Sequence, residues 1–223
     1  MKSVLVIGLG RFGRHLCLKL SQLGNEVMIV DKDEAVVTDL ANAVTSAQIA
    51  DCTDEAALHA LGVHNFDVCF VCIGSDFASS LLITSILKDL GAQRIIAKSS
   101  NDMHTRLLLR NGADEVVYPE RDSAERIAMR TSATNVFDYI ELTDGYAIYE
   151  VPPLPEWVGK TIIELDIRNR YRINILAVKT EGNLRPLPGA GYAFTGMEHL
   201  LVLAGREDIR KLLRKVESVS PSR

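Results

Sequence analysis

The feature that most constrains the fold is a regular alternation of short apolar runs and amphipathic segments in the first half of the chain. The runs that predict strands are 3–9, 26–31, 46–51, 68–73, 94–99 and 115–119, and the predicted helices are 11–23, 33–43, 54–61, 77–90 and 101–111. Strand, helix, strand, repeated through about 118 residues, is typical of a parallel doubly wound sheet. Several runs are continuous Val and Ile, as expected for strands buried on both faces. We therefore predict an α/β, Rossmann-like first domain over residues 1–120.

The second half of the chain predicts a connecting helix and a smaller α/β domain. A crossover helix is expected within 121–138, starting at Asp122 or Ser123, running to about Ser132 and extending toward Phe137. Residues 139–223 then predict strands at 146–152, 173–179 and 198–205, helices at 159–170 and 206–217, and a hairpin turn at 181–183. So short a domain has a marginal core, and burying a face against a second copy would stabilise it.

Composition narrows the functional classes. A formal net charge of −4 argues against a sequence-independent hold on nucleic acid or anionic lipid, because both need a concentrated basic surface. The longest apolar runs fall far short of the roughly 20 residues that cross a bilayer, so any membrane role is expected through a partner. The opening residues predict the first strand of a cytoplasmic protein rather than a signal peptide, because Arg11 interrupts a short apolar run.

Cys69 and Cys72 have the spacing of a redox or zinc motif, but they lie in a predicted buried strand. Residues three apart on a strand point to opposite faces of the sheet. A pair that cannot converge is a poor metal clamp. We therefore interpret both cysteines as small buried apolar residues.

The stretch "VLVIGLGRFGRHL" contains the strongest functional motif. Gly8, Gly10 and Gly13 follow a predicted strand and open a predicted helix, so the backbone can turn tightly and approach a pyrophosphate at the helix N-terminus. Asp31 ends the second strand, 18 residues beyond Gly13, where a carboxylate accepts ribose hydroxyls and repels a 2′-phosphate. The pattern predicts an adenine nucleotide site.

Arg11 departs from a plain dinucleotide loop, because it projects between Gly10 and Gly13. A guanidinium there can neutralise a terminal phosphate, and the alternative is a solvated surface arginine. Asp51, Cys52 and Thr53 follow the third strand and are expected along the adenine, with Gly74, Ser75 and Asp76 on the opposite rim. Asp76 is equally well placed to cap the next helix, and Lys98 either faces a phosphate or extends along the surface.

The sequence lacks the residues that an oxidoreductase needs beside a nicotinamide. Its histidines, at positions 15, 59, 64, 104 and 199, carry no paired motif, and neither a nucleophile elbow nor a complete Gly-x-x-x-x-Gly-Lys-[Ser/Thr] phosphate loop occurs. A nucleotide site without chemistry predicts a sensor and not an enzyme. Two alternatives stay open: a small NAD-dependent oxidoreductase or an NAD(H)-sensing regulator. A redox-sensing transcription regulator would need a basic DNA-reading helix, and none is evident.

The motifs, in their order, resemble RCK domains, also called KTN or TrkA-type domains, and in particular the cytosolic regulatory subunits of Ktr-type potassium uptake systems. The matching segments are "VIGLGRFGRHL", "IVDKDE", "ADCTDEAAL", "VCIGSD", "NGADEVVYPE" and "GKTIIELDIRNRYRINILAVKTEGN". The resemblance implies homodimers assembled into an octameric ring on a membrane-embedded channel or transporter subunit, at the inner face of the plasma membrane. It also implies gating by ATP or ADP.

The resemblance assigns roles to individual residues. Arg11 would contact the γ-phosphate, Asp31 the ribose, and Glu120 a divalent cation, Mg²⁺ or Ca²⁺, near the nucleotide. The complete set expected to bind the nucleotide is Gly8, Gly10, Arg11, Phe12, Gly13, Asp31, Lys32, Asp51, Cys52, Thr53, Ile73, Gly74, Ser75, Lys98 and Glu120. A second ligand, cyclic di-AMP, is implied for the C-terminal domain. Its expected contacts are Arg168 and Asn174, with Ile163, Ile167, Ile173 and Pro188 as apolar walls.

Overall fold

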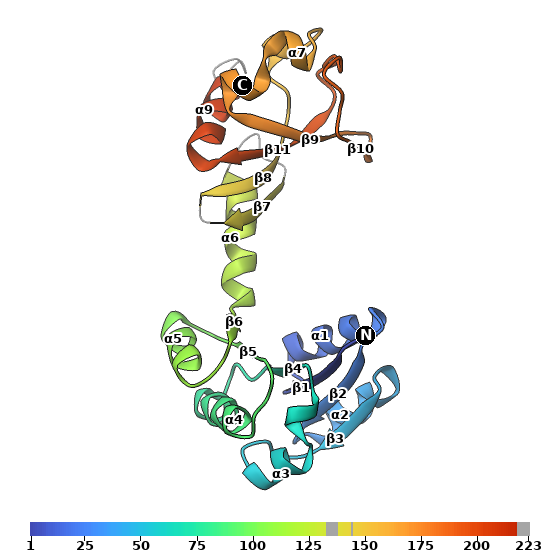
Figure 1. Cartoon of the computed structure of the whole chain (residues 1–223), viewed down its shortest axis with the longest axis vertical. Coiled ribbons are helices and arrows are strands. Elements are labelled where there is room, and N and C mark those ends of the chain that lie inside the picture. The colour runs from blue at the N-terminus through green and yellow to red at the C-terminus, as the bar shows by residue number, and fades with distance from the viewer. Residues whose placement is uncertain (133–137, 144, 218–223) are drawn as a thin grey trace. The chain divides into compact units, whose positions relative to one another are not determined.

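The computed structural model describes residues 1–132, 138–143 and 145–217, and these divide into two compact units, Met1–Arg121 and Asp122–Arg223 (Figure 1). Each unit has its own sheet and its own core. The predicted α/β fold class is confirmed for the first unit by a six-stranded parallel sheet with flanking helices.

The first sheet has the strand order β3-β2-β1-β4-β5-β6. Its strands are β1 (Ser3–Ile7), β2 (Glu26–Asp31), β3 (Ser46–Ile49), β4 (Val68–Val71), β5 (Ile95–Lys98) and β6 (Glu115–Val117). The order reverses direction between β1 and β4, and in open parallel sheets the carboxyl ends at such a point form a ligand crevice.

Helices cover both faces of this sheet (Figure 1). They are α1 (Arg11–Gln22), α2 (Glu34–Leu40), α3 (Glu55–Ala60), α4 (Phe77–Asp89) and α5 (Asp102–Arg110). One face carries Val4 and Val6 and packs against α1 and α2, whereas the other carries Leu5 and Ile7 and packs against α3, α4 and α5. The alternation along β1 follows from the two-residue period of a strand.

Cys69 and Cys72 belong to the cores on opposite faces of the sheet, as the strand period predicts. Both side chains are buried, at 0% and 6% exposed. Burial raises the pKa of each thiol to about 12, so both remain protonated at neutral pH. The interpretation of the pair as apolar filling is therefore consistent with the structure.

Helix α6 (Pro119–Ser132) begins earlier than predicted. Proline is favoured in the first turn of a helix because its ring fixes φ and its missing N–H has no partner there in any case. The expected start at Asp122 or Ser123 was wrong for this reason. The expected extension toward Phe137 falls on residues 133–137, outside the described residues.

The second unit contains a five-stranded antiparallel sheet of order β10-β9-β11-β8-β7. Its strands are β7 (Asp138–Thr143), β8 (Tyr146–Val151), β9 (Ile173–Thr180), β10 (Asn183–Pro186) and β11 (His199–Gly205), and α9 (Arg206–Glu217) packs against β11. Trp157 and Phe194, at 0% and 1% exposed, are the largest side chains in its core.

The single helix expected over 159–170 is instead two short helices, α7 (Ile162–Leu165) and α8 (Ile167–Tyr171). Asp166 between them has φ 46° and ψ 48°, a left-handed conformation that interrupts the helical hydrogen bonds. Thr161 and Glu164 form a capping box that starts α7, since each side chain bonds to the backbone N–H of the other.

Candidate nucleotide-binding site

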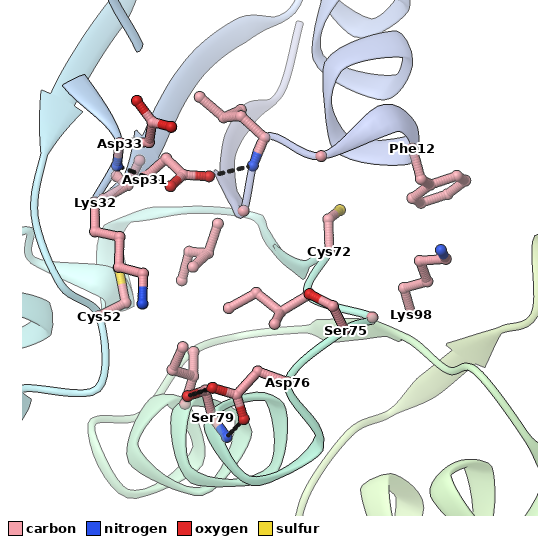
Figure 2. Close-up of a pocket in the computed structure, with 18 of the residues that line it drawn as sticks. Phe12, Asp31, Lys32, Asp33, Cys52, Cys72, Ser75, Asp76, Ser79 and Lys98 are labelled. Carbon is pink, nitrogen blue, oxygen red and sulfur yellow. Dashed lines mark hydrogen bonds between the residues drawn. The ribbon is translucent and has the colours of Figure 1, made fainter. Parts of the chain in front are cut away.

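A cavity of about 660 Å³ lies at the carboxyl ends of the central strands of the first sheet (Figure 2). All of the residues expected to bind nucleotide line it, except Gly13. Those in the lining are Gly8, Gly10, Arg11, Phe12, Asp31, Lys32, Asp51, Cys52, Thr53, Ile73, Gly74, Ser75, Lys98 and Glu120. Its volume lies in the range of small-molecule sites in proteins.

Glycine is favoured at the three positions of the first loop for different structural reasons. Gly8 has φ +90°, and a Cβ there would lie 2.8 Å from Ile73 Cγ1. A Cβ on Gly13 would lie 2.0 Å from the Gly8 carbonyl oxygen, so Gly13 allows α1 to pack closely on the loop and does not line the cavity. Gly10 has open space around its Cα and is the N-cap of α1, with no side chain to bond the first-turn amides. Those amides are the groups that bind phosphate at a helix N-terminus.

Asp31 is held by backbone donors at the end of β2 (Figure 2). Its Oδ2 accepts from Leu9 N at 2.6 Å and its Oδ1 accepts from Asp33 N at 3.1 Å. These contacts tie the carboxylate to the glycine loop and to the turn that starts α2. A fixed carboxylate at this position is what recognition of ribose hydroxyls requires.

The carboxylates of Asp51 and Asp76 also line the cavity. Asp51 Oδ1 accepts from Thr53 Oγ1 at 2.7 Å and Thr53 N at 2.9 Å, and these bonds lower the pKa of Asp51. Asp76 accepts from Ser79 Oγ at 2.7 Å and Ser79 N at 3.0 Å, with the same effect on its pKa. Asp76 is thus the N-cap of α4 and a lining residue at the same time, so both interpretations of it hold.

The cavity walls between these polar groups include two cysteines. Cys52 and Cys72 are 4% and 6% exposed, and burial raises the pKa of Cys52, like that of Cys72, to about 12. Protonated thiols contribute apolar surface, suited to the flat faces of a base or the carbons of a ribose.

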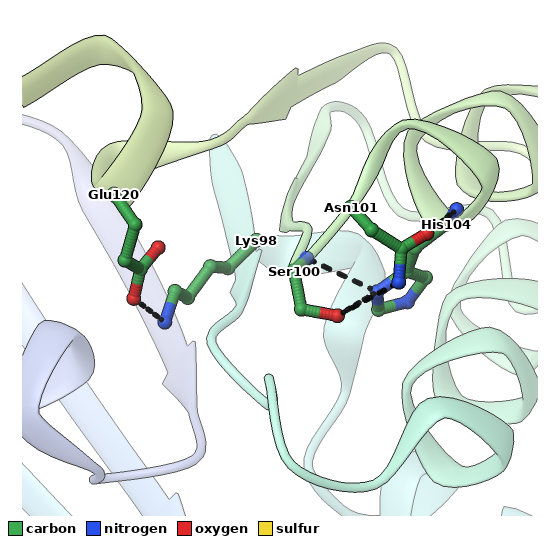
Figure 3. Close-up of polar contacts among 5 residues, drawn as sticks. All are labelled: Lys98, Ser100, Asn101, His104 and Glu120. Atoms are coloured by element: carbon green, nitrogen blue, oxygen red, sulfur yellow. Dashed lines mark hydrogen bonds and ion pairs between the residues drawn. The ribbon is translucent and has the colours of Figure 1, made fainter. Parts of the chain in front are cut away.

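Arg11, Lys98 and Glu120 gather at another part of the cavity. Lys98 Nζ lies 2.7 Å from Glu120 Oε1 (Figure 3), and only 14% of the lysine side chain is exposed. The hydrogen bond from Lys98 lowers the pKa of Glu120, and the positive charge of Arg11 lowers it further. Lys98 also lies against Gly74, where a Cβ would be 3.2 Å from Nζ. The ammonium therefore faces the cavity and not the outer surface.

Several lining residues were not predicted from the sequence. They are Ile7, Leu9, Val30, Asp33, Val36, Ala50, Cys72, Ser79, Ile83 and Ser100. Most are apolar residues beside predicted contacts. Ser100 had a usable signal, because it follows Lys98 by two residues at the end of β5, where residues of this spacing lie on the same side.

None of the five histidines lines the cavity. His15, His59 and His64 are exposed and His104 is fully buried. The histidines carry no paired motif in the sequence, but the structure brings His199 Nδ1 to 2.8 Å from Glu150 Oε1 across β8 and β11. That carboxylate also accepts from Lys179 Nζ at 2.9 Å. The pairing joins residues 49 apart in sequence, so no local motif announces it.

The residues expected around a second ligand lie in the second unit. Arg168 Nε donates to Asn174 Oδ1 at 2.8 Å, so this expected pair is in contact. Ile163 is 68% exposed and Pro188 is half-buried. Ile167 and Ile173, at 2% and 1% exposed, are packed within the core.

No helix in the described part of the chain is both long and apolar enough to span a bilayer. No three His, Cys, Asp or Glu side chains in the part of the chain that the structure describes are grouped as a metal site.

Comparison with known families gives two matches in chain order. The TrkA-N domain matches residues 4–119, and the TrkA-C domain matches residues 146–217. The chain belongs to the TrkA-type family. The predicted resemblance to RCK, KTN or TrkA-type proteins is therefore confirmed.

TrkA-type relatives match over nearly their whole length. The chain is 41% identical to Ktr system potassium uptake protein C of Bacillus subtilis, covering 96% of this chain and 97% of that protein. It is 37% identical to Ktr system potassium uptake protein A of the same organism, covering 94% and 95%. It is 30% identical to the Vibrio alginolyticus protein A, covering 98% of each.

Solved structures share the TrkA-type fold. The GsuK channel matches with a TM-score of 0.72 and 21% identity, over 96% of this chain and 39% of the channel chain. The GsuK channel bound to NAD matches with a TM-score of 0.69 and 22% identity, over 98% and 39%. The GsuK structure bound to ADP matches with a TM-score of 0.53 and 21% identity, over 60% and 35%. This chain thus spans about two fifths of the channel chain or less.

Proposed function

We propose that this chain is a nucleotide-sensing regulatory subunit of a potassium uptake system and not an enzyme. The observation that carries the proposal is a single cavity that joins a glycine loop, a fixed carboxylate suited to ribose, and three cationic residues, Arg11, Lys32 and Lys98. The related Ktr proteins are named for potassium uptake, which supports the transport assignment. No histidine lines the cavity to relay protons, which favours sensing over catalysis.

In this proposal ATP and ADP bind with the pyrophosphate over Gly8 and Gly10 and the ribose on Asp31. The remaining phosphate of ATP lies near Arg11, which forms charge-assisted hydrogen bonds that ADP makes less fully. Because ligands shift an equilibrium only through different affinities for its states, this contact is what lets the subunit respond to the ATP to ADP ratio.

Calorimetric titration of the full chain with ADP tests the nucleotide assignment. We expect saturable binding that weakens roughly tenfold or more in Asp31→Asn, since bonds to a charged acceptor are worth about 1.5–3 kcal/mol. Asp39→Asn is the matched control, because Asp39 is exposed and pairs with Arg14 outside the cavity. Absence of ADP binding to the wild type would contradict the proposal.

NAD(H) is the second candidate ligand, either for sensing or for a small oxidoreductase. It is favoured by Asp31, whose charge suits an unphosphorylated ribose, and by the GsuK channel structure bound to NAD. Competition between NAD and ADP for the purified chain separates the candidates. Tighter NAD binding would favour the second, and reproducible nicotinamide turnover would establish an oxidoreductase.

A divalent cation, Mg²⁺ or Ca²⁺, is proposed beside Glu120. The structure offers one carboxylate there, already bonded to Lys98, so nucleotide phosphates would have to supply other ligands. If the proposal holds, Mg²⁺ tightens ATP binding in the wild type and much less in Glu120→Gln. Equal Mg²⁺ effects in the two proteins would remove Glu120 from the site.

Cyclic di-AMP is proposed for the second unit on the basis of the Arg168 and Asn174 pair and exposed Ile163. The buried Ile167 and Ile173 would support the site from the core and not line its surface. Saturable binding that is lost in Arg168→Ala, with Arg170→Ala as control, is the expected result. Unchanged affinity in Arg168→Ala would refute the assignment.

The assembly in this proposal is a homodimer that forms an octameric ring on a membrane-embedded potassium channel or transporter subunit. The subunit would then be cytoplasmic and peripheral to the inner face of the plasma membrane through that partner. We assign residues 1–120 to the nucleotide-binding domain, 121–138 to the crossover linker and 139–223 to the C-terminal dimerisation domain. Light scattering of the purified chain gives the ring size, and co-purification with the membrane fraction tests the partner.

A further inference from the structure

We propose that His104 is a positioning residue for the nucleotide cavity, holding the Ser100 side of the wall in place through its neutral imidazole. The inference rests on the proposed function, because the property it explains is nucleotide affinity. His104 lies on α5 behind the wall and does not itself line the cavity.

The contacts run from the buried histidine to the cavity surface (Figure 3). His104 Nδ1 lies 3.4 Å from Ser100 N and 3.3 Å from Ser100 Oγ. Ser100 lines the cavity two residues beyond Lys98, which pairs with Glu120. The imidazole therefore connects the interior of the first unit to the Lys98 side of the site.

The geometry requires one protonation state. An imidazole nitrogen that accepts from a backbone N–H carries no proton, so the proton of the neutral ring is on Nε2. His104 is 0% exposed, and its Nε2 has no hydrogen-bond partner within the described residues. The ring of Phe77 from α4 lies over the imidazole, with a centroid distance of 4.7 Å. A charged ring would lose the Ser100 N–H bond and would be poorly solvated.

Further hydrogen bonds fix the loop between β5 and α5, which contains Ser100. Asn101 Oδ1 accepts from His104 N at 2.9 Å and caps α5, and Thr105 Oγ1 donates to Ser99 Oγ at 2.8 Å. Ser99 N donates to Val117 O at 2.9 Å. Ser99 is thus anchored through both its backbone and its hydroxyl, whereas exposed Ser100 is held by the imidazole and by a longer contact of 3.5 Å from Asn101 Nδ2 to its Oγ.

Surrounding charges do not offset the cost of burial. Burial lowers the pKa of His104, and no neighbouring carboxylate raises it. The carboxylates of the elements around α5 have other partners: Asp76 bonds Ser79, Asp102 pairs with Arg121, Asp114 with Lys88, Glu115 with Arg94 and Glu120 with Lys98. The other charged residues of α4 and α5 are Asp89, Arg106 and Arg110. The neutral form therefore persists through neutral pH, and acidification removes the support.

The linkage fixes the sign of the pH effect. If nucleotide binding needs an ordered Ser100, it favours neutral His104, so affinity is full above the histidine pKa and falls as pH drops through it. ADP titrates over part of the same range, but that titration is common to all variants. The ratio of ADP dissociation constants between variant and wild type isolates the contribution of the histidine.

The test measures ADP affinity of the full chain from pH 8 to pH 5 for wild type, His104→Phe, Ser100→Ala and His64→Asn. His104→Phe keeps a ring but no acceptor, and His64 is an exposed histidine outside the cavity, which makes it the control. At pH 8 we expect His104→Phe to bind roughly fivefold more weakly than wild type, the effect of one neutral hydrogen bond. The ratio should fall toward one as the pH drops through the pKa of His104, and Ser100→Ala should also bind more weakly than His64→Asn.

A purely structural role would lower stability and leave this pH profile unchanged. Equal ADP affinity at pH 8, or a ratio that is constant with pH, would overturn the inference while leaving the proposed function intact. Absence of ADP binding to the wild type would overturn both. If His104→Phe fails to fold, imidazole NMR of the wild type decides, because ADP should lower the pKa of His104 and an unchanged value would refute the role.

Discussion

At the scale of single residues, the two glycines at the start of α1 carry different constraints. A Cβ at Gly13 would meet the Gly8 carbonyl oxygen at 2.0 Å, whereas a Cβ at Gly10 would meet nothing within 4 Å. We expect Gly13→Ala to lower the free energy of unfolding of the first unit by about 1–3 kcal/mol through overpacking. Gly10→Ala should retain the fold but bind ADP more weakly, because its methyl group enters the cavity. Urea unfolding and ADP titration of both variants check this, and equal stability losses would contradict it.

Glu198 is a second residue with a defined energetic role, this time in the second unit. It is 1% exposed and accepts from Thr195 N and Met197 N at 2.8 and 2.9 Å, and from Thr195 Oγ1. Burial raises the pKa of this carboxyl, but these bonds outweigh it and the net pKa is lowered. A lowered folded-state pKa means that the stabilisation is present above the unfolded-state value, about 4.5, and is lost as pH falls through the folded value.

Glu198→Gln should therefore lower the stability of the second unit by about 1–3 kcal/mol at pH 7 and flatten its acid dependence. Thermal unfolding between pH 7 and pH 3 measures both effects. Glu181→Gln, at an exposed turn position, is the control and should keep the wild-type profile. An unchanged acid dependence in Glu198→Gln would show that the carboxylate does not act in this way.

At the scale of elements, the hairpin between β9 and β10 predicts opposite changes in stability for two substitutions. Thr180 pairs with Asn183, and the two residues between them have positive φ, 49° for Glu181 and 81° for Gly182. This is the turn that favours Asn-Gly. Glu181→Asn should stabilise the second unit by roughly 0.5–1 kcal/mol, whereas Gly182→Ala should destabilise it by about 1 kcal/mol or more. Differential scanning calorimetry checks both variants, and the same sign for both would contradict the turn assignment.

The elements also show where sequence reasoning succeeds. All six strands of the first sheet and the five helices from α1 to α5 were predicted to within a few residues, because buried parallel strands and amphipathic helices leave strong local patterns. Gly24, Gly62, Gly91 and Gly112 have positive φ, as is common for glycines that follow the last turn of a helix. In the second unit, neither β7 nor β10 was predicted as a strand, and the helix over 159–170 was predicted unbroken.

Those failures have a physical cause. Asp166 adopts a left-handed conformation although it is not a glycine, so the sequence gives no local signal for the break. The residues on either side of it, Leu165 and Ile167, are buried in the core. The ion pair of Lys98 with Glu120 and the contact of His199 with Glu150 join residues that are far apart in the sequence. The position of the cavity was predictable because the carboxyl ends of the strands share one edge of the sheet, whereas the pairing of its side chains was not.

At the scale of the whole molecule, the chain combines two units with separate cores. The first contains the cavity at the carboxyl ends of its parallel strands, and the second contains an antiparallel sheet on which Asn174 of β9 contacts Arg168 of α8. The two units match the TrkA-N and TrkA-C domains, and the relatives that match over nearly the whole chain are named for potassium uptake. The central claim is that the first unit distinguishes nucleotides by their phosphates through Arg11.

The most direct test is the ratio of ADP to ATP dissociation constants for wild type, Arg11→Ala and Arg14→Ala. Arg14 lies on the same helix but pairs with Asp39 at 2.5 Å and does not line the cavity, so it is the matched control. We predict that wild type and Arg14→Ala bind ATP roughly tenfold more tightly than ADP, and that the ratio falls to about one in Arg11→Ala. A wild-type ratio of one, or a ratio that survives in Arg11→Ala, would contradict the account.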